Sequence, residues 1–101
     1  MTDTSNPLAI YAADLFADKC VLVTGGGRGI GRAIALAFAR LGADCVIASR
    51  NVENLAPTAA EIEKLGRRCL ALPVNIRDPQ AVSEMVDKAI ETMGKIDFLI
   101  N

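Results

Sequence analysis

The sequence predicts an α/β fold: a doubly wound parallel sheet with helices packed on both faces. Three observations support this prediction. Short continuous apolar runs rich in Val, Ile and Leu recur along the chain, as in strands that are buried on both faces. Between these runs lie segments with apolar residues at helical spacing. The two kinds of segment alternate, which predicts parallel strands joined by right-handed helical crossovers.

The first half of the chain contains two of these strands and one helix. The run CVLVT at residues 20–24 predicts the first strand, and CVIAS at 45–49 predicts the second. A helix is expected over 30–41, because Gly42 suits its C-terminal end. The apolar positions that recur at helical spacing predict its buried face: Ile30, Ala33, Ile34, Ala37, Phe38 and Leu41.

A second helix is expected over residues 52–65, with Gly66 behind it. Pro57 bears on where this helix begins, because proline is well tolerated only in the first turn of a helix. A start nearer residue 56 would satisfy that requirement. The expected apolar face consists of Leu55, Ala59, Ile62 and Leu65.

The last third of the chain adds a strand, a helix and a final strand. CLALPV at 69–74 predicts the third strand, and IDFLI at 96–100 predicts the fourth. The helix between them starts at Asp78, because Asp is a favoured N-cap and Pro79 fits the first helical position. It ends at Gly94, and its apolar stripe is Val82, Met85, Val86, Ala89, Ile90 and Met93.

Composition excludes several classes of function. The chain has 101 residues, 51% hydrophobic content and a net charge of −1, so nothing favours a nucleic-acid partner. The N-terminal stretch is not typical of a signal peptide, and no apolar run reaches the length of a membrane span. We therefore expect a soluble intracellular protein. There is no histidine and no C-x-x-C pair, so no metal site is expected, and Cys20, Cys45 and Cys69 are expected to be small buried side chains.

The stretch TGGGRGIG at residues 24–31 holds five of the eight glycines and joins the first strand to the first helix. It lacks the Lys and the hydroxyl of the ATP-binding pattern G-x-x-x-x-G-K-S/T, and it does not fit G-x-G-x-x-G. It does fit G-x-x-x-G-x-G, with Gly25, Gly29 and Gly31. Bare glycines let a pyrophosphate reach backbone N–H groups at a helix start, so the stretch predicts dinucleotide binding rather than a plain turn.

Thr24 precedes these glycines, and residue type alone leaves its role open. Its hydroxyl can hold the shape of the loop. Equally, a β-branched residue is typical of a strand end.

The end of the second predicted strand indicates which dinucleotide is bound. A site for NAD usually has Asp or Glu there, which binds the ribose 2′-hydroxyl. Here the residues are Ser49, Arg50 and Asn51, with no carboxylate. Arg50 would attract a 2′-phosphate, Arg28 in the glycine stretch would add a second positive charge, and Ser49 could donate a hydrogen bond. These residues predict NADP(H), unless both arginines are ordinary solvated side chains.

With these motifs, the chain resembles the short-chain dehydrogenase/reductase family from about residue 19 to 101. VLVTGGGRGIGRAIALAFARLGA resembles the family opening T-G-x-x-x-G-I/L-G, and GKIDFLIN resembles the approach to its N-N-A-G segment, with Asn101 as the first Asn. The family usually has Asp before an aliphatic residue after the third strand, where the Asp meets adenine. Here Asn75 and Ile76 take those places, and Asn still offers an amide donor and an acceptor. The resemblance implies this cofactor-binding set: Thr24, Gly25, Gly27, Arg28, Gly29, Ile30, Gly31, Ser49, Arg50, Asn51, Asn75, Ile76 and Asn101.

The runs CVIASR and NIRD are similar to the branch that reduces coenzyme-A thioesters, which includes peroxisomal trans-2-enoyl-CoA and 2,4-dienoyl-CoA reductases. Those members use NADPH. The resemblance implies hydride transfer to a carbonyl or an enoyl-CoA thioester in fatty acid metabolism. It also implies a homo-oligomer at full length and a cytoplasmic or peroxisomal location. Bacterial 3-oxoacyl reductases and polyol dehydrogenases share much of the same pattern.

The family's chemistry rests on a catalytic Ser and a Tyr-x-x-x-Lys beyond the fourth strand, and this chain contains neither. Its one tyrosine, Tyr11, precedes the first strand and has Leu15 four positions later. We therefore expect an N-terminal lead-in at 1–18 and an incomplete Rossmann-type dinucleotide-binding domain at 19–101, inactive alone. The expected strand order is 3-2-1-4, which leaves 96–100 as an apolar edge strand.

Two other functions fit the same residues. One is a small non-catalytic module that senses or buffers NADP(H). The other is an interaction protein that pairs through its open sheet edge. A sequence that ends within an unprotected strand argues against both, so a fragment of an oxidoreductase is preferred.

Overall fold

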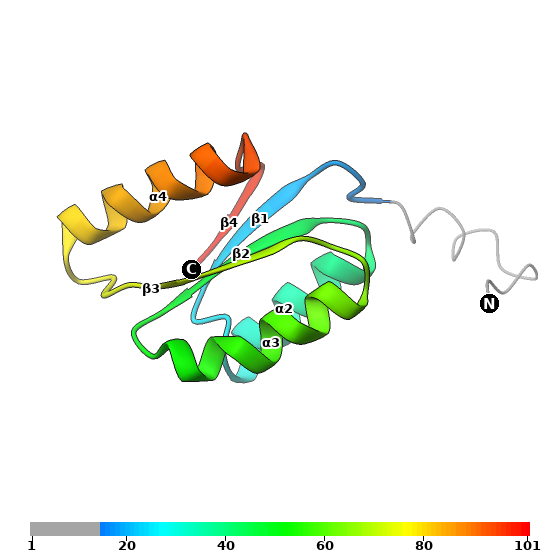
Figure 1. Cartoon of the computed structure of the whole chain (residues 1–101), viewed down its shortest axis with the longest axis horizontal. Helices are drawn as coiled ribbons and strands as arrows, with labels where there is room; N and C mark the ends of the chain where they lie inside the picture. The colour runs from blue at the N-terminus through cyan, green and yellow to red at the C-terminus, as the bar shows by residue number, and fades with distance from the viewer. Residues whose placement is uncertain (1–14) are drawn as a thin grey trace, which may run out of the picture.

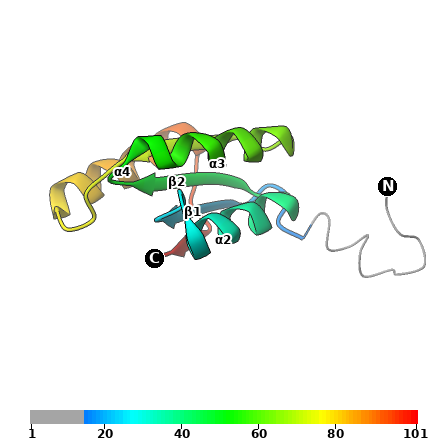
Figure 2. The same ribbon diagram turned by 90° about the horizontal axis from the view of Figure 1, so that it is seen from below.

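Four parallel strands form one sheet in the order β3-β2-β1-β4, as predicted. The structure, a computed structural model, describes residues 15–101, so Tyr11 and most of the predicted lead-in lie outside the described part. Its elements are β1 (Cys20–Thr24), α2 (Gly29–Arg40), β2 (Asp44–Ser49), α3 (Val52–Lys64), β3 (Cys69–Pro73), α4 (Pro79–Met93) and β4 (Phe98–Ile100). Helices α2 and α3 lie alongside each other on one side of the sheet, and α4 lies on the other (Figures 1 and 2).

The two central strands, β1 and β2, are buried on both faces, and their alternate residues supply two separate cores. The edge strands β3 and β4 are partly exposed. Val21 and Val23 of β1 pack with Ile47 in the core beneath α2 and α3. Leu22 and Val46 pack in the core beneath α4. This double burial explains why the sequences of β1 and β2 are continuous apolar runs rather than alternating ones.

The predicted buried face of the first helix was only partly right. Ile34 and Phe38 are half-buried and pack against the core, but Ala33 and Ala37 are exposed. Ile30 is 79% exposed, whereas α2 buries Ala35, Leu36 and Ala39. The two alanines let the helix axis come close to the sheet, which a row of larger side chains would prevent. Ile30 belongs to the first turn of α2, between Gly29 and Gly31. Apolar residues lie on two adjacent faces of this helix, so periodicity alone does not determine which face is buried.

The second helix covers the predicted range, because α3 runs from Val52 to Lys64. The alternative start nearer residue 56 is wrong, since Pro57 lies in the interior of the helix. A proline there leaves the carbonyl of Glu53 without its helical partner. Both residues are exposed, so water can hydrate that carbonyl. The buried face is Leu55, Thr58 and Ile62, while Leu65 follows the helix and is 42% exposed.

The third helix begins and ends as predicted. The Asp78 carboxylate accepts hydrogen bonds from the N–H groups of Gln80 at 3.0 Å and Ala81 at 3.4 Å. Pro79 occupies the first helical position, and Gly94 follows the helix with φ 88°. Met85 and Ala89 are the residues that α4 buries fully.

The fourth strand is shorter than the predicted 96–100. The Asp97 carboxylate accepts a hydrogen bond from the N–H of Cys20 at 2.8 Å, and the N–H of Asp97 donates to the Cys20 carbonyl at 2.8 Å. A side chain therefore takes the place of one ladder bond between β1 and β4, and regular pairing begins only at Phe98. The other strand and helix ends lie within one or two residues of their predicted positions.

Three aromatic rings join the start of the described chain to the sheet and α2. The ring of Phe16 stacks on Phe38 with centroids 4.8 Å apart and meets Phe98 at 5.2 Å. The N–H of Phe16 also donates to the Leu41 carbonyl at 2.7 Å. These contacts fix the residues that lead into β1.

The cysteine prediction is confirmed for two of the three side chains: Cys20 and Cys45 are buried, and Cys69 is half-buried. Within residues 15–101, no group of His, Cys, Asp or Glu is arranged to hold a metal ion. None of the helices in that range combines the length and apolar character needed to cross a membrane.

Candidate functional site

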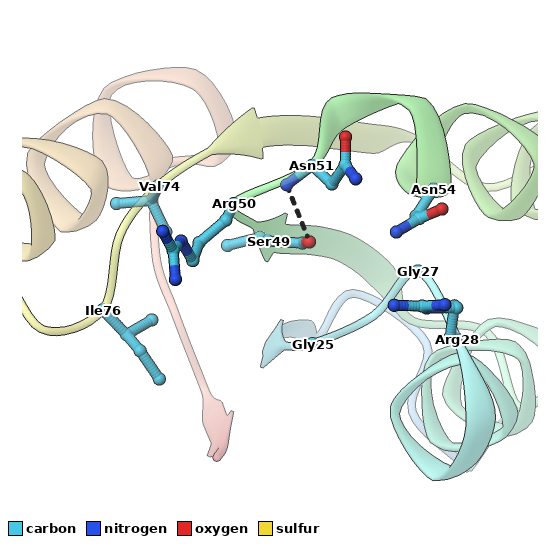
Figure 3. A pocket seen from close by; sticks show the side chains of 10 residues that line it. Gly25, Gly27, Arg28, Ser49, Arg50, Asn51, Asn54, Val74 and Ile76 are labelled. Carbon is cyan, nitrogen blue, oxygen red and sulfur yellow. Dashed lines mark hydrogen bonds between the residues drawn. The ribbon is translucent and has the colours of Figure 1, made fainter.

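A pocket of about 410 Å³ lies where β1, β2 and β3 end, which is the edge of an open parallel sheet where ligands bind. The glycine stretch forms one wall, and the segments after β2 and β3 form the others (Figure 3). Seven of its ten lining residues belong to the predicted set, namely Gly25, Gly27, Arg28, Ser49, Arg50, Asn51 and Ile76. The other three are Ala48, Asn54 and Val74.

The three glycines of the predicted motif are needed for two different reasons. Gly25 and Gly29 have φ of 74° and 56°, a conformation that favours glycine. Gly31 has an ordinary φ but no room for a side chain. A Cβ there would overlap the carbonyl oxygen of Gly25 and lie 2.7 Å from its carbonyl carbon. The stretch thus folds back so that its start touches the first turn of α2.

The remaining glycines of the stretch pack against neighbouring elements. A Cβ on Gly26 would lie 2.8 Å from the Cβ of Ile47, in β2. One on Gly27 would lie 2.7 Å from the Cβ of Asn54 and 2.8 Å from its carbonyl oxygen, in α3. The loop therefore sits against both β2 and α3, and this packing accounts for the two glycines that the motif does not require.

The first turn of α2 leaves backbone donors available beside the pocket. Arg28 is the N-cap residue, and its side chain makes no capping hydrogen bond. The N–H groups of the first turn have no partner within the helix, and the positive end of its dipole lies there. Gly29, Ile30 and Gly31 belong to this turn and do not line the pocket themselves.

The pocket carries two positive charges and no carboxylate among its lining residues. Arg28 and Arg50 are both exposed, and neither forms an ion pair with another residue of the described range. Arg32 differs, because its guanidinium pairs with Glu61 at 3.0 Å and donates to Thr58 at 2.8 Å. Arg28 and Arg50 line the pocket, whereas Arg32 does not.

Two predicted residues make structural contacts at the other end of the sheet edge. The Thr24 hydroxyl donates to Oδ1 of Asn101 at 2.8 Å and lies 3.4 Å from the Ile100 carbonyl oxygen. It thus joins β1 to the end of β4 and does not hold the glycine loop. Both Thr24 and Asn101 line a separate apolar hollow beside α4, which Ile76 also borders.

Asn75 lies beside the main pocket, in a hollow that it shares with Arg50 and Pro73. Its Oδ1 accepts the N–H of Arg77 at 3.0 Å, which closes a turn after β3. One of the two acceptor positions of that oxygen is therefore occupied, while the NH₂ group keeps its donors. Val74 and Ile76, on either side, line the main pocket with apolar surface.

Sequence reasoning missed Asn54, Ala48 and Val74. Ala48 and Val74 lie at predicted strand ends, so the rule that parallel strands meet ligands at their carboxyl ends could have identified them. Asn54 follows Asn51 by three residues, which places it on the same side of α3. Only the contact between α3 and Gly27 brings it to the pocket, and no local pattern signals that contact.

Comparison with known proteins agrees with this geometry. The family model described as short chain dehydrogenase matches residues 19–101. The (3E)-enoyl-CoA-producing peroxisomal 2,4-dienoyl-CoA reductase of Danio rerio is 43% identical over 93 residues, which are 91% of this chain and 31% of that protein. This relative is a reductase of coenzyme-A thioesters, so the predicted resemblance to that branch of the family is confirmed.

Solved structures of the same family share the fold. A short chain dehydrogenase from Burkholderia cenocepacia, in complex with NADP, has a TM-score of 0.83 and 44% identity over 85% of this chain and 36% of its own. Carveol dehydrogenase from Mycobacterium avium, in complex with NAD, has a TM-score of 0.79 and 30% identity over 82% of this chain and 34% of its own.

The chain spans about a third of the length of the curated relatives it matches. That third contains the strand order, the glycine stretch and the pocket described above. The match extends from just before β1 to the end of β4. The chain belongs to the short-chain dehydrogenase/reductase family.

Proposed function

We propose that this chain forms the adenosine-binding part of an NADP(H) site in an oxidoreductase. One observation carries the proposal: Arg28 and Arg50, which have no acidic partner in the described range, line the same pocket, and no carboxylate lines it. A 2′-phosphate carries about two negative charges, which two arginines can bind bidentately. A carboxylate at the end of β2, as NAD sites have, would repel that phosphate.

The shape of the pocket fits the rest of the nucleotide. Gly25 and Gly29 leave open space beside the loop, because a Cβ on either would meet no protein atom within 4 Å. A pyrophosphate fits there, against the free N–H groups of the first turn of α2. Val74 and Ile76 offer an apolar surface to the adenine ring, and the NH₂ group of Asn75 offers it a donor. A nicotinamide, when bound, supplies or accepts a hydride.

For the substrate, we propose an enoyl-CoA thioester or a carbonyl compound. The relative from Danio rerio supports the first class, because its name states a dienoyl-CoA substrate and an enoyl-CoA product. The 101 residues include no catalytic Ser with Tyr-x-x-x-Lys, so this stretch alone should bind nucleotide weakly and reduce nothing. The protein would act in the cytoplasm or the peroxisome, and imaging of a tagged full-length form distinguishes the two.

Calorimetric titration with NADPH and NADH tests the cofactor assignment. Arg50→Asp should weaken NADPH binding by about tenfold to a hundredfold, since it removes a charged hydrogen bond and adds repulsion. NADH binding should change little. Arg40→Asp is the matched control, because it makes the same charge change at the far end of α2. If Arg50→Asp leaves the NADPH/NADH affinity ratio unchanged, the assignment is wrong.

A further inference from the structure

The glycine stretch before α2 meets the first turn of α3 at one side of the pocket, and this contact places Asn54 there. The missing Cβ of Gly27 is what allows the approach, since it would lie 2.7 Å from the Cβ of Asn54. Asn54 is half-buried in the first turn of α3, and its side-chain amide points into the pocket beside Arg28 (Figure 3). The amide is therefore part of the wall that a ligand would touch.

A cluster one helical turn away holds this arrangement in place. Arg32 of α2 donates to the hydroxyl of Thr58 at 2.8 Å and pairs with Glu61 at 3.0 Å, and Thr58 is fully buried. Arg32 follows Arg28 by one turn of α2, and Thr58 follows Asn54 by one turn of α3. The cluster thus fixes the two helices relative to each other and keeps Arg28 and Asn54 on the same wall.

The chemistry of the wall favours an anion. Among the ten lining residues, the one hydrogen bond to a side chain joins the N–H of Asn51 to Oγ of Ser49, at 3.1 Å. The amide of Asn54 is not used in this way, and it offers two N–H donors. Arg32 cannot serve the same ligand, because Glu61 already neutralises it. Ser49 accepts in that bond and keeps its own O–H donor, so a group between Arg28 and Arg50 would find uncharged donors in both Ser49 and Asn54.

We propose that Asn54 is a specificity-determining residue that donates a hydrogen bond to the phosphate on the ribose of the bound nucleotide. This inference rests on the proposed NADP(H) function. An amide donates to a phosphate and tolerates a hydroxyl, whereas a carboxylate of the same shape repels the phosphate and accepts from the hydroxyl. Position 54 then discriminates between the phosphorylated and unphosphorylated ribose.

Two near-isosteric substitutions test this role without disturbing the packing against Gly27. Asn54→Asp adds a charge that the first turn of a helix tolerates, and Asn54→Leu removes the donors. Binding of NADPH and NADH is measured by calorimetry for each purified protein. Asn54→Asp should weaken NADPH binding at least tenfold and NADH binding less than threefold. Asn54→Leu should weaken NADPH binding about tenfold, as expected for a lost hydrogen bond to a charged group.

Ala60→Asp provides the control, because it adds the same charge at an exposed position of α3 outside the pocket. It should leave the NADPH/NADH ratio within twofold of the wild type. If the wild type prefers NADPH and Asn54→Asp keeps that preference, the role of Asn54 is refuted and the proposed function stands. If the wild type binds NADPH and NADH equally, the NADP(H) assignment itself fails, and the role of Asn54 fails with it.

Discussion

Gly31→Ala should destabilise the protein even though alanine is the better helix former. The new Cβ would overlap the carbonyl oxygen of Gly25 and lie 2.7 Å from its carbonyl carbon, whereas ordinary contact begins near 3.4 Å. The loop would have to move by about 0.7 Å to clear the carbonyl carbon alone, and further to clear the nearer carbonyl oxygen. Gly25 resists this movement, because its N–H donates to the Ala48 carbonyl at 2.6 Å.

The magnitude follows from two opposing effects. Overpacking against a rigid neighbour costs roughly 3 kcal/mol at the upper end of its usual range. Replacing glycine by alanine in a helix returns up to about 1 kcal/mol. The net loss is therefore about 2 kcal/mol, which lowers the Tm of a chain of this size by about 10 °C.

Thermal and urea unfolding without nucleotide measure this loss, and calorimetry measures nucleotide affinity. Gly94→Ala is the matched control, because Gly94 has φ 88° and its Cβ would meet no atom within 4 Å. It should cost about 1 kcal/mol and leave nucleotide binding intact. Gly31→Ala should weaken nucleotide binding as well, since it displaces the loop. Equal or greater stability in Gly31→Ala would refute the steric argument.

Three further predictions concern other parts of the fold. The hydrogen bond from the Cys20 N–H, and then the charge of Lys95, lower the pKa of Asp97 below its usual 3.8. The ionised carboxylate therefore stabilises the fold above pH 3.8, and this stabilisation is lost as the pH falls through the lowered pKa. The difference in unfolding free energy between wild type and Asp97→Asn should therefore shrink from pH 7 to pH 3, and a constant difference in urea titrations would contradict the assignment. Burial raises the pKa of the Cys45 thiol to about 12, so a thiol reagent at pH 8 should modify it only as fast as the protein unfolds; rapid labelling of the native state would show that the thiol is accessible. Phe16→Ala removes a stacked ring that is half-buried and should cost about 2 kcal/mol in urea unfolding, whereas an unchanged midpoint would mean that the aromatic contacts do not anchor the residues before β1.

Strand order and the glycine stretch could be predicted because both depend on local pattern. Continuous apolar runs mark strands that are buried on both faces, and five glycines between a strand and a helix indicate a backbone that a ligand approaches. The same logic identified Arg28 and Arg50, since they lie at the ends of adjacent parallel strands, which meet at one edge of the sheet.

The buried face of α2 could not be predicted in this way. Ile30 is larger and more apolar than Ala35 and Ala39, so periodicity favoured the face that contains it. The structure buries the alanines because the distance between helix and sheet decides the outcome. That distance is a property of the packed fold rather than of the helix.

Asn54 and Pro57 show two other limits. Asn54 reaches the pocket through a contact between α3 and the glycine loop, and residues 27 positions apart in sequence create it. Pro57 lies inside a helix because solvent can hydrate the carbonyl that it leaves unpaired, which depends on the exposure of that turn. The position of Asn54 and the place of Pro57 inside α3 could be predicted only with knowledge of the atoms that surround α3.

The position of β1 between β2 and β4 has a consequence for synthesis on the ribosome. β1 can pair with β2 once residue 49 has emerged, but its other partner is β4, and the Asp97–Cys20 hydrogen bond joins residues 77 apart. Roughly 50 residues must be translated between these two events, which at typical elongation rates takes about 2.5–10 s. During that interval a strand whose first four residues are all apolar has one open edge on the nascent chain. The speed of translation between β2 and β4 therefore sets how long the nascent protein can pair with a neighbouring chain instead of with itself.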